Sequence, residues 1–570
     1  MDENFKKAYV AGVERVSAWA DLLDAINVFP VADGDTGRNL SVSLSPLRHA
    51  GNEKDRLVRQ LLLAARGNSG NIASQFFTTF CAAGSMYDLA GVAREGAANA
   101  WKAVSDPRPG TMLSMFDALE DVLWQENFIP DAATAGKIIA RLELAVHETH
   151  DLLPKLKEAG VIDAGALGMY IFFEGFFNTL AGVQDAYRPV TEVFHGRLRI
   201  SSSFKEQAES GYCVDFVLKA GDQASAQLAA MSQTQENVIV IPQGDLYKIH
   251  LHTNDMEKVR TQMAALGSVV NWEDDNLSAQ IAQLLNAPAF SSLHILADAA
   301  GSLTRDDAKK YGFTLLNSYL NVGEKSLPET CFHPEELYSA MRQGVKVSTS
   351  QSSVFERHQF YSSVLARFEK ALYLCVGSVY TGNYQVALDW KKEHDPDNRL
   401  WVIDTGAASG RLGTIVLATL RHLAQTGDME ATCAFAKKAV ETCEEYVFLE
   451  KLEYLAAGGR LSKTSAFFGD MLKMKPVISP QPEGAKKVGV VRNRKDQIKM
   501  ALEKMAAALH KDTRALIMLE YSDNIEQVAE FREEAQKLYP QAEIILQPLS
   551  LTSGAHMGPG TWGVAFLPEE

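Results

Sequence analysis

Apolar residues recur at helical spacing through the first part of the chain. One helix is predicted over residues 4–28, where five apolar side chains fall on one face. That face comprises Phe5, Val13, Val16, Leu23 and Ile26. Pro30 ends this helix, because proline lacks a backbone donor and clashes with the preceding turn. A second helix is predicted after Asn39 and a third over 64–80, so the pattern favours a helical N-terminal region.

The pattern changes after about residue 190, where short runs rich in β-branched and aromatic residues alternate with helical stretches. Strands are predicted over 211–218, 237–241 and 246–252, and helices over 221–232 and 255–266. Together they predict a small α+β module, followed by a short linker at 286–289. From Leu293 onward strands and helices alternate, which is typical of an α/β architecture.

The composition indicates several domains of an ordinary globular protein. A chain of 570 residues is longer than a single hydrophobic core requires. The net charge is -15 and basic runs are absent from the sequence, which argues against a nucleic-acid partner. No apolar run approaches the length of a membrane span, and the N-terminus lacks the basic and apolar regions of a signal peptide. Six scattered cysteines predict reduced thiols, so we expect a cytoplasmic protein.

Two acids lie one residue apart in the loop after the first helix. Asp33 and Asp35 flank Gly34, with Asn27 six residues before the first acid and Asn39 four residues after the second. Hard oxygen ligands on a tight turn suit Mg²⁺, which also shares the phosphates of a nucleotide. Glycines allow the backbone to turn closely enough for both carboxylates to reach one ion. The alternative is an ordinary Asp-Gly turn between two helices.

The third predicted helix begins near the small residues 67–70. Small side chains leave backbone N–H groups uncovered at a helix start, where the dipole favours an anion. A phosphate group is one expected occupant. Close packing of two helices also requires small residues, so the sequence leaves both interpretations open.

Two histidines lie on one predicted strand. Side chains alternate along a strand, so His250 and His252 point to the same face, and Cys213 on a neighbouring strand is expected to join them. Two imidazoles and a thiolate supply three of the four ligands of tetrahedral Zn²⁺, the fourth being water, substrate or an acid such as Asp255. Alternatively, the imidazoles act without metal by moving a proton or steadying a phosphate, or they simply face solvent.

Several ordered motifs resemble a known kinase system. Residues 27–39 resemble the N-terminal signature of the fatty acid kinase A subunit, which is related to the ATP-binding L domain of dihydroxyacetone kinase. The likeness continues at 65–71, 110–113 and 161–168, with Ala164 and Ala166 departing from the pattern, and at 210–213 and 248–255 for the middle domain of the same protein. The resemblance implies a helical bundle or barrel that binds ATP and Mg²⁺. The implied nucleotide contacts are Asn27, Asn39, Asn68, Ser69, Gly70, Thr111, Met112, Asp163 and Gly165.

The last half of the chain resembles the DegV family, the fatty-acid-binding subunits of that system. The motifs lie at 347–352, 376–385, 401–405, 452–462 and 554–560. The resemblance implies two α/β lobes with an acyl chain buried between them, and a head group held by Arg460, Thr349, Ser378 and His556. Burial removes the tail from water at about 0.8 kcal/mol per CH₂, whereas an unpaired buried carboxylate is costly. Arginine binds such a carboxylate bidentately; the plain alternative for Gly-Gly-Arg is a helix cap followed by a solvated cation.

The chain departs from the family pattern at two places. Asp298 is followed by two alanines where serine and threonine are expected, and Asn383 stands where threonine is usual.

These inferences combine into a multidomain prediction. A helical ATP- and Mg²⁺-binding domain spans 1–187, an α+β middle domain 188–287 and a two-lobed DegV-like α/β domain 291–570. The predicted function is a single-chain fatty acid kinase that makes an acyl phosphate. The expected catalytic residues are Asp33, Asp35, Arg460, His556 and His250, with Mg²⁺ on the two aspartates and Zn²⁺ on Cys213, His250 and His252.

Two other functions remain open at this point. The first is a dihydroxyacetone-type kinase, and the second is a lipid-binding or regulatory protein without catalysis. The expected partners are a fatty acid, a membrane surface touched transiently for lipid exchange, and a second copy of the chain in a homodimer, with no nucleic acid.

Overall fold

Two compact units, residues 1–287 and 288–570, make up the computed structural model of the protein. The structure describes residues 2–569 except 52, 105, 127, 184–186, 207–209, 222–223, 225, 229–237, 286–291 and 458–474. Each unit has buried apolar clusters of its own.

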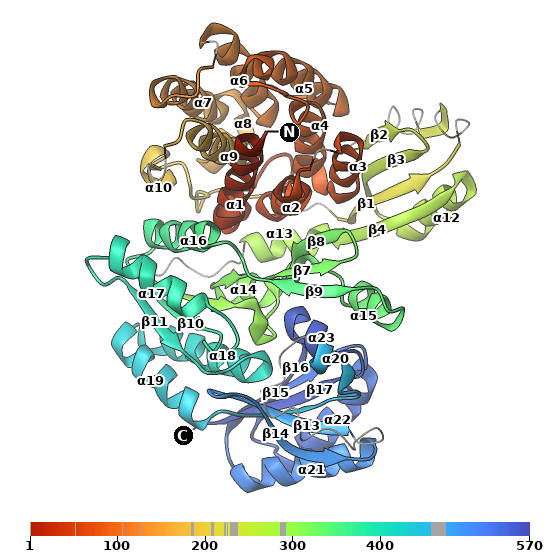
Figure 1. Ribbon diagram of the computed structural model, residues 1–570, viewed down its shortest axis with the longest axis vertical. Coiled ribbons are helices and arrows are strands. Elements are labelled where there is room, and N and C mark those ends of the chain that lie inside the picture. Colours follow the sequence, from red (N-terminus) through yellow and green to blue (C-terminus); the bar gives the residue numbers. More distant parts are fainter. Residues whose placement is uncertain are drawn as a thin grey trace. The chain divides into compact units, whose positions relative to one another are not determined.

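The first unit begins with a domain of helices (Figure 1, red to orange). Its helices are α1 (Glu3–Ala25), α2 (Thr36–Ser43), α3 (Lys54–Ala64), α4 (Gly67–Phe80), α5 (Leu89–Ala103), α6 (Met112–Glu126), α7 (Ala132–Leu152), α8 (Pro154–Ala159), α9 (Ala164–Leu180) and α10 (Val190–Val193). The nearly all-apolar α9 packs against α1, and rings from α4 and α9 fill the space between. This confirms the helical N-terminal fold class.

The predicted helix boundaries hold in part. α1 stops at Ala25, three residues before the predicted end, and α4 begins at Gly67 as expected. The start predicted for the second helix is wrong, because α2 begins at Thr36, before Asn39. The reason is a long-range cap: Asp24 Oδ1 accepts the N–H of Gly37 at 2.6 Å, which satisfies a free donor of the first turn.

A four-stranded antiparallel sheet follows in the same unit. It comprises β1 (Tyr212–Lys219), β2 (Ile239–Gln243), β3 (Leu246–Thr253) and β4 (Ser268–Asn276) in the order β2-β3-β1-β4. α12 (Met256–Leu266) and α13 (Leu277–Leu285) follow β3 and β4. The strands predicted around 211, 237 and 246 are confirmed, and the described residues of the helix predicted over 221–232 are helical in part. The sequence did not predict β4 and α13.

The two faces of this sheet differ in chemistry. Val214, Phe216 and Ile249 point to one face, which α12 covers through Val259 and Met263. On the other face Val217 packs with Leu62 of α3, so the sheet lies against the helical domain (Figure 1). The polar side chains that alternate with the apolar ones therefore point toward the helices that follow the acidic loop.

The second unit holds two sheets and a small ribbon. The first sheet is parallel, in the order β11-β10-β5-β6, and the second is mixed, in the order β14-β13-β12-β17-β15-β16. The parallel sheet contains β5 (Leu293–Asp298), β6 (Thr314–Leu316), β10 (Lys370–Cys375) and β11 (Leu400–Asp404). The mixed sheet contains β12 (Glu444–Phe448), β13 (Lys475–Gln481), β14 (Gly484–Val491), β15 (Ala515–Tyr521), β16 (Glu543–Pro548) and β17 (Trp562–Pro568). The ribbon contains β7 (Tyr319–Val322), β8 (Lys325–Pro328) and β9 (Val347–Ser350).

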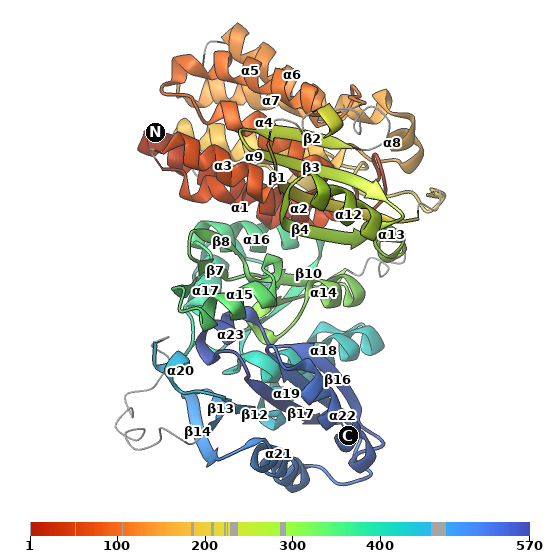
Figure 2. The same ribbon diagram turned by 90° about the vertical axis from the view of Figure 1, so that its right-hand side faces the viewer.

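Helices link the two sheets into one α/β unit. They are α14 (Arg305–Tyr311), α15 (Pro334–Arg342), α16 (Val354–Arg367), α17 (Asn383–His394), α18 (Ser409–Thr426), α19 (Met429–Thr442), α20 (Glu453–Ala457), α21 (Arg494–Ala508), α22 (Ile525–Leu538) and α23 (Leu551–Met557). Apolar side chains of α18 share one core with β5 and β10 of the parallel sheet and with β15 and β17 of the mixed sheet. α21 and α22 cover the opposite face of the mixed sheet (Figure 2). The predicted two-lobed α/β fold is confirmed.

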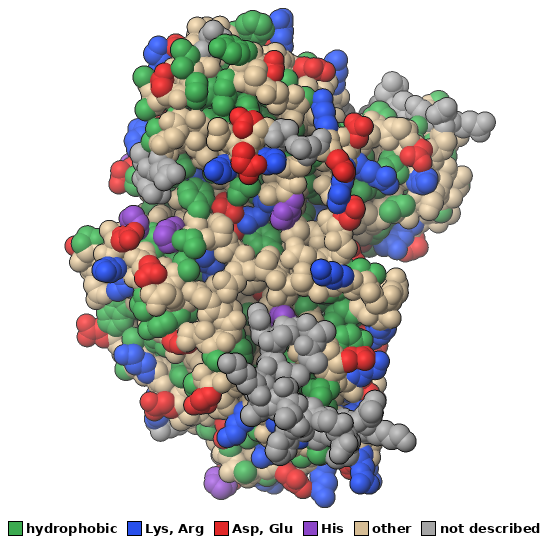
Figure 3. Space-filling view, viewed as in Figure 1, with side chains coloured by type: hydrophobic (Ala, Val, Ile, Leu, Met, Phe, Trp, Pro, Cys, Tyr) green, Lys and Arg blue, Asp and Glu red, His purple; other side chains and the backbone are tan. Residues whose placement is uncertain are grey.

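Three further observations concern membrane spans, surface charge and the cysteines. Within the described residues no helix is both long enough and apolar enough to cross a membrane. Basic and acidic side chains are interspersed on the face drawn in Figure 3. The six cysteines are all buried and free.

Candidate active site

The acidic loop, residues 26–39, is held by its own side chains. Asn27 Nδ2 donates to Asp33 Oδ1 at 2.8 Å, and Thr36 Oγ1 donates to Asn27 Oδ1. Asp35 is buried at the start of α2, while Asp33 is half-buried. The Asn27 amide therefore orients one of the two acids, and its own contact with metal or phosphate stays a prediction.

The two acids create an unfavourable concentration of negative charge. Burial raises the pKa of Asp33, and the neighbouring carboxylate of Asp35 raises it further. A cation bound at the loop would offset this repulsion and favour the ionised form of Asp33. Two hard oxygen donors that leave room for phosphate oxygens fit Mg²⁺.

Two glycines fix the shape of the acidic loop. Gly34 has a φ of 63°, in the left-handed region that favours glycine. Gly37 lies against α1, where an added Cβ would stand 2.1 Å from the carbonyl oxygen of Ala20. Asp24 Oδ1 also accepts the N–H of Arg38 at 3.2 Å. The end of α1 thus determines where the loop can run.

The start of α4 lies on the middle-domain sheet. The N–H of Gly67 donates to Asp215 Oδ2 at 2.8 Å, so a carboxylate of β1 takes a donor of the first turn. Asn68 is half-buried in that turn, and Ser69 Oγ is buried with no hydrogen-bond partner among the described residues. An unpartnered hydroxyl beside a helix start is suited to a phosphate oxygen.

Close packing also occurs at this helix start. A Cβ on Gly70 would stand 2.0 Å from Ser43 Oγ of α2, and one on Gly67 would stand 2.1 Å from Asn39 Nδ2. The close-packing interpretation is therefore confirmed for α2 and α4, and phosphate binding at this helix start stays a prediction. Asn39 lies buried between α2 and α4.

The two later loops meet each other. Asp163 caps α9 by accepting the N–H of Ala166 at 2.7 Å, and the backbone of Met112 also donates to its carboxylate. Burial raises the pKa of Asp163 to about 6, although these hydrogen bonds oppose the rise. Gly165 packs against the Met112 side chain, and the Thr111 hydroxyl donates to a carbonyl of its own loop. The structure brings these four predicted residues together at the start of α6 and α9, and α9 packs on α1 and α2.

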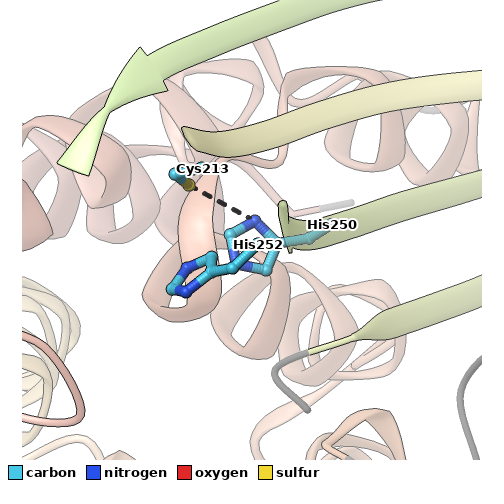
Figure 4. A group of neighbouring side chains, drawn as sticks. All are labelled: Cys213, His250 and His252. Atoms are coloured by element: carbon cyan, nitrogen blue, oxygen red, sulfur yellow. Dashed lines mark hydrogen bonds between the residues drawn. The ribbon is translucent and has the colours of Figure 1, made fainter. Parts of the chain in front are cut away.

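The Cys213, His250 and His252 side chains come together as the strand alternation predicts. Across the β1–β3 pair Cys213 lies opposite His252, and Asp215 lies opposite His250. One ligand atom from each of the three residues falls within 4.8 Å of the others (Figure 4). The link drawn there joins Cys213 Sγ and His250 Nδ1 at 3.8 Å. His250 Nε2 and His252 Nδ1 are buried without hydrogen-bond partners among the described residues.

The charges around this cluster suit a cation. Burial raises the pKa of the Cys213 thiol, and four nearby carboxylates raise it further. They are those of Asp215, Asp35, Asp33 and Asp275. Burial and the neighbouring His250 lower the pKa of His252 to about 4, so its imidazole is neutral at pH 7. A thiol and two imidazoles with carboxylates around them form a donor set that fits Zn²⁺. Asp33 and Asp35 are among these carboxylates, so the cluster lies beside the acidic loop.

In the second unit the structure joins two of the predicted head-group residues. Thr349 Oγ1 on β9 and His556 Nε2 on α23 are 3.1 Å apart, and both side chains are half-buried. Ser378 is exposed in the loop after β10, where its N–H donates to Asp404 Oδ1 at 2.9 Å. Arg460 lies outside the described residues.

Asp298, which precedes the two departing alanines, and the departing residue Asn383 belong to one buried network. Asp298 accepts hydrogen bonds from Arg357 Nη1 at 2.8 Å, Tyr373 OH at 2.8 Å and Asn383 Nδ2 at 3.0 Å. Asn383 therefore serves as a donor to Asp298 at the start of α17. The network secures the carboxyl end of β5.

Several residues of this site were missed from the sequence. They lie on both sides of the contact between the helical domain and the sheet: Arg38, Arg66, Asp215, Lys248, Glu273 and Asp275. Arg66 pairs with Glu273 at 2.5 Å and Arg38 with Asp275 at 3.4 Å. Only Asp215 carried a usable signal, because it follows Cys213 by two residues and thus shares its face.

Family models match three successive parts of the chain. A DAK2 domain model matches residues 30–178, and a model described as the middle domain of FakA-like fatty acid kinase proteins matches 209–284. A model described as an uncharacterised protein of the DegV family matches 292–569. The order is the one the sequence motifs predict.

Curated relatives match 48% of this chain. An uncharacterized protein of Staphylococcus saprophyticus is 29% identical over 309 residues, covering 48% of this chain and 55% of the relative. An uncharacterized protein of Staphylococcus aureus is also 29% identical, over 308 residues, with the same coverage. The chain thus spans about half the length of the curated relatives it matches.

Two solved structures are among those to which part of the chain is similar. A DegV family protein from Thermus thermophilus, solved for its fatty acid binding, is 25% identical with a TM-score of 0.46, covering 49% of this chain and 99% of that one. DegV of Bacillus subtilis, described as a fatty acid binding protein, is 19% identical with a TM-score of 0.44, covering 49% and 100%. On the family models, one polypeptide carries a DAK2 domain, a FakA-like fatty acid kinase middle domain and a DegV-family domain.

Proposed function

We propose that the chain is an ATP-dependent fatty acid kinase of the cytoplasm, which converts a fatty acid and ATP into an acyl phosphate and ADP. The observation that carries the proposal is the presence of a DAK2 domain, a FakA-like middle domain and a DegV domain in one chain. The acidic loop beside the Cys213 cluster supports it, since both lie in the unit that would bind ATP.

The donor side would be assembled on the acidic loop and α4. Asp33 and Asp35 would hold Mg²⁺, which neutralises phosphate charge when bound. The first turn of α4, with Asn68 and Ser69, would bind phosphate oxygens through N–H and hydroxyl donors. Phosphoryl transfer depends mainly on such positioning and charge neutralisation.

The acceptor would be the carboxylate of the fatty acid. One carboxylate oxygen attacks the γ-phosphorus, the bond from that phosphorus to the β–γ bridging oxygen breaks, and ADP leaves with the electron pair. An ionised carboxylate has no proton to lose, so the step requires no general base. His250 is therefore assigned to holding charge or metal near the transferring group.

The head group would be oriented in the DegV domain. Arg460 would pair with the carboxylate, while His556, Thr349 and Ser378 would add hydrogen bonds. The neighbouring Thr349 and His556 supply one half of such a site. Cys213, His250 and His252 would hold Zn²⁺, which stabilises the middle domain and adds positive charge when bound.

Loading would take place at a membrane surface that the chain touches transiently. Transfer within one chain and transfer between the two chains of a homodimer are chemically equivalent. A covalent fusion raises the effective concentration of donor for acceptor when the linkers span the geometry.

A substrate comparison tests the proposal. The full chain is incubated with Mg²⁺ and ATP plus oleate, dihydroxyacetone or no acceptor, and ADP release is followed. Asp35→Ala serves as the inactive variant, and Asp121→Ala, an exposed carboxylate of α6, as its matched control. Oleate-dependent release that Asp35→Ala abolishes and Asp121→Ala retains is expected. Release with dihydroxyacetone alone would indicate a sugar kinase, and the absence of release with either acceptor would indicate a silent lipid-binding protein.

A further inference from the structure

Asp215 is a buried carboxylate at the contact between the helical domain and the middle-domain sheet. It lies on β1 and is 5% exposed. Its oxygens meet four donors from two segments: Gly67 N–H at 2.8 Å, Asn71 Nδ2 at 3.1 Å, Lys248 Nζ at 3.2 Å and His250 Nδ1 at 3.0 Å. Two of these donors belong to α4 and two to β3.

Asp215 determines which nitrogen of His250 is free. Gly67 N–H and the Lys248 ammonium can only donate, so the Asp215 carboxylate acts as an acceptor at both oxygens. In the 3.0 Å contact with Oδ2, His250 Nδ1 therefore carries the hydrogen. The proton-free Nε2 then lies buried and unpartnered within the described structure. The contact of Nδ1 with Cys213 Sγ is longer, at 3.8 Å.

The same carboxylate ties that imidazole to α4. Gly67 and Asn71 belong to the start of the helix that is assigned to phosphate binding, and Asn71 Nδ2 also bonds the Gly67 carbonyl at 2.7 Å. Lys248 is 1% exposed, so its charge depends on Asp215 for compensation. Loss of the carboxylate would leave donors of both segments unpaired.

We infer that Asp215 is a positioning residue of the kinase site: it fixes the Nδ1–H form of His250 and joins that imidazole to the first turn of α4. The inference deepens the proposed function and rests on it for its catalytic meaning. It concerns hydrogen bonds of the chain itself, which can be measured without turnover.

Asp215→Asn tests the first half of the inference. In the parent, Gly67 N–H and His250 Nδ1 share Oδ2, whereas Asn71 Nδ2 and the Lys248 ammonium face Oδ1. The carboxamide keeps the shape but has a single oxygen, which the buried Lys248 ammonium draws to its side, so the NH2 donor faces His250 Nδ1. ¹⁵N shifts of histidine-labelled full-length protein, recorded after chelator treatment and assigned with His250→Gln, report the tautomer. The parent is expected to show unprotonated Nε2, and D215N the opposite form. Asp245→Asn, an exposed carboxylate paired with Lys219, is the matched control and should leave the shifts unchanged. Protonated Nε2 in the parent would overturn the inference.

Amide hydrogen exchange tests the second half. Exchange in residues 64–71 is expected to quicken by about tenfold in D215N and by several-fold in Asn71→Ala, because each lost bond frees the first turn. N71A removes the bonds of Asn71 to Asp215 and to the Gly67 carbonyl but leaves His250 Nδ1 bonded to Asp215, so its His250 tautomer should stay that of the parent. If D215N does not fold, the amide exchange of N71A and the His250 tautomer of the parent still test the inference. Unchanged exchange in N71A would refute the link between Asp215 and the first turn of α4.

Turnover separates this inference from the proposed function. If the parent releases no ADP with any acceptor, the kinase assignment fails while the tautomer and exchange results stand. If the parent is active, D215N should lower kcat and leave the KM for oleate within about twofold, since the acceptor is bound in another domain. A raised KM with normal kcat would contradict a positioning role.

Discussion

Replacing Gly37 by alanine is expected to displace the acidic loop. The new Cβ would stand 2.1 Å from the carbonyl oxygen of Ala20, 2.6 Å from its Cα and 2.7 Å from its carbonyl carbon. All three atoms are backbone atoms of α1, so no side-chain rotation relieves the contact. A normal carbon–oxygen contact is about 1 Å longer than the first distance, and α2 must move away from α1 by a similar amount.

The cost follows from the size of this overlap. Overpacking against rigid backbone costs about 3 kcal/mol, which lowers the unfolding temperature of a domain of this size by roughly 6–12 °C. The shift also lengthens the bond from Gly37 N–H to Asp24 Oδ1, so Mg²⁺-dependent binding of ADP should weaken. Both effects are measured on the full chain, by calorimetric unfolding and by titration with ADP.

Gly136→Ala is the matched control for this experiment. Gly136 lies within α7, and an added Cβ would meet nothing within 4 Å. Alanine there should stabilise the helix by up to about 1 kcal/mol and leave ADP binding unchanged. If G37A unfolded at the parent temperature with normal ADP binding, the close packing of α2 on α1 would be incorrect.

Three further predictions concern the remaining sites. Metal analysis of the parent should find about one zinc per chain, and Cys213→Ser and His252→Ala should lose it because each variant removes one of three protein ligands. A carefully prepared parent without zinc would end the metal assignment. A variant that loses activity but retains zinc would favour a direct role of the imidazoles. Arg460→Ala and His556→Gln should retain less extractable fatty acid at unchanged ATP binding, because the head-group carboxylate loses a hydrogen-bond partner worth a few kcal/mol. Parental lipid content in both variants would contradict the head-group assignment. Burial raises the pKa of Glu329 to about 7, so its folded state binds a proton more tightly than its unfolded state. The stability that this protonated carboxyl supplies, on the order of 3 kcal/mol, is present below pH 4.5 and is lost as the pH rises to 7. Glu329→Gln should therefore flatten the plot of unfolding free energy against pH between these values. An unchanged slope of that plot would refute the raised pKa of Glu329.

Local patterns predicted the elements that carry strong periodicity. α1, the start of α4 and the paired strands β1 and β3 follow from residue spacing alone. The constellation of Cys213, His250 and His252 follows from strand alternation, since the register places Cys213 opposite His252. Two elements with weaker periodicity were not predicted. β4 is an edge strand whose side chains are mostly exposed or half-buried, and α13 is short.

Long-range contacts could not be predicted in this way. Asp24 caps α2 from the end of α1, and Asp215 reaches Gly67 across 148 positions of sequence. Neither residue belongs to a recognisable motif, because its role depends on which segments pack together. The same reason explains why the sequence placed the second helix after Asn39, whereas the cap from Asp24 allows it to begin at Thr36.

The most direct test of the kinase assignment compares two products of one reaction. The full chain is incubated with ATP, Mg²⁺ and oleate, acyl phosphate is trapped with hydroxylamine as the hydroxamate, and ADP is measured in the same sample. The assignment predicts equal amounts of hydroxamate and ADP, and loss of both in Asp35→Ala. ADP without hydroxamate, or hydroxamate that persists in Asp35→Ala, would contradict it.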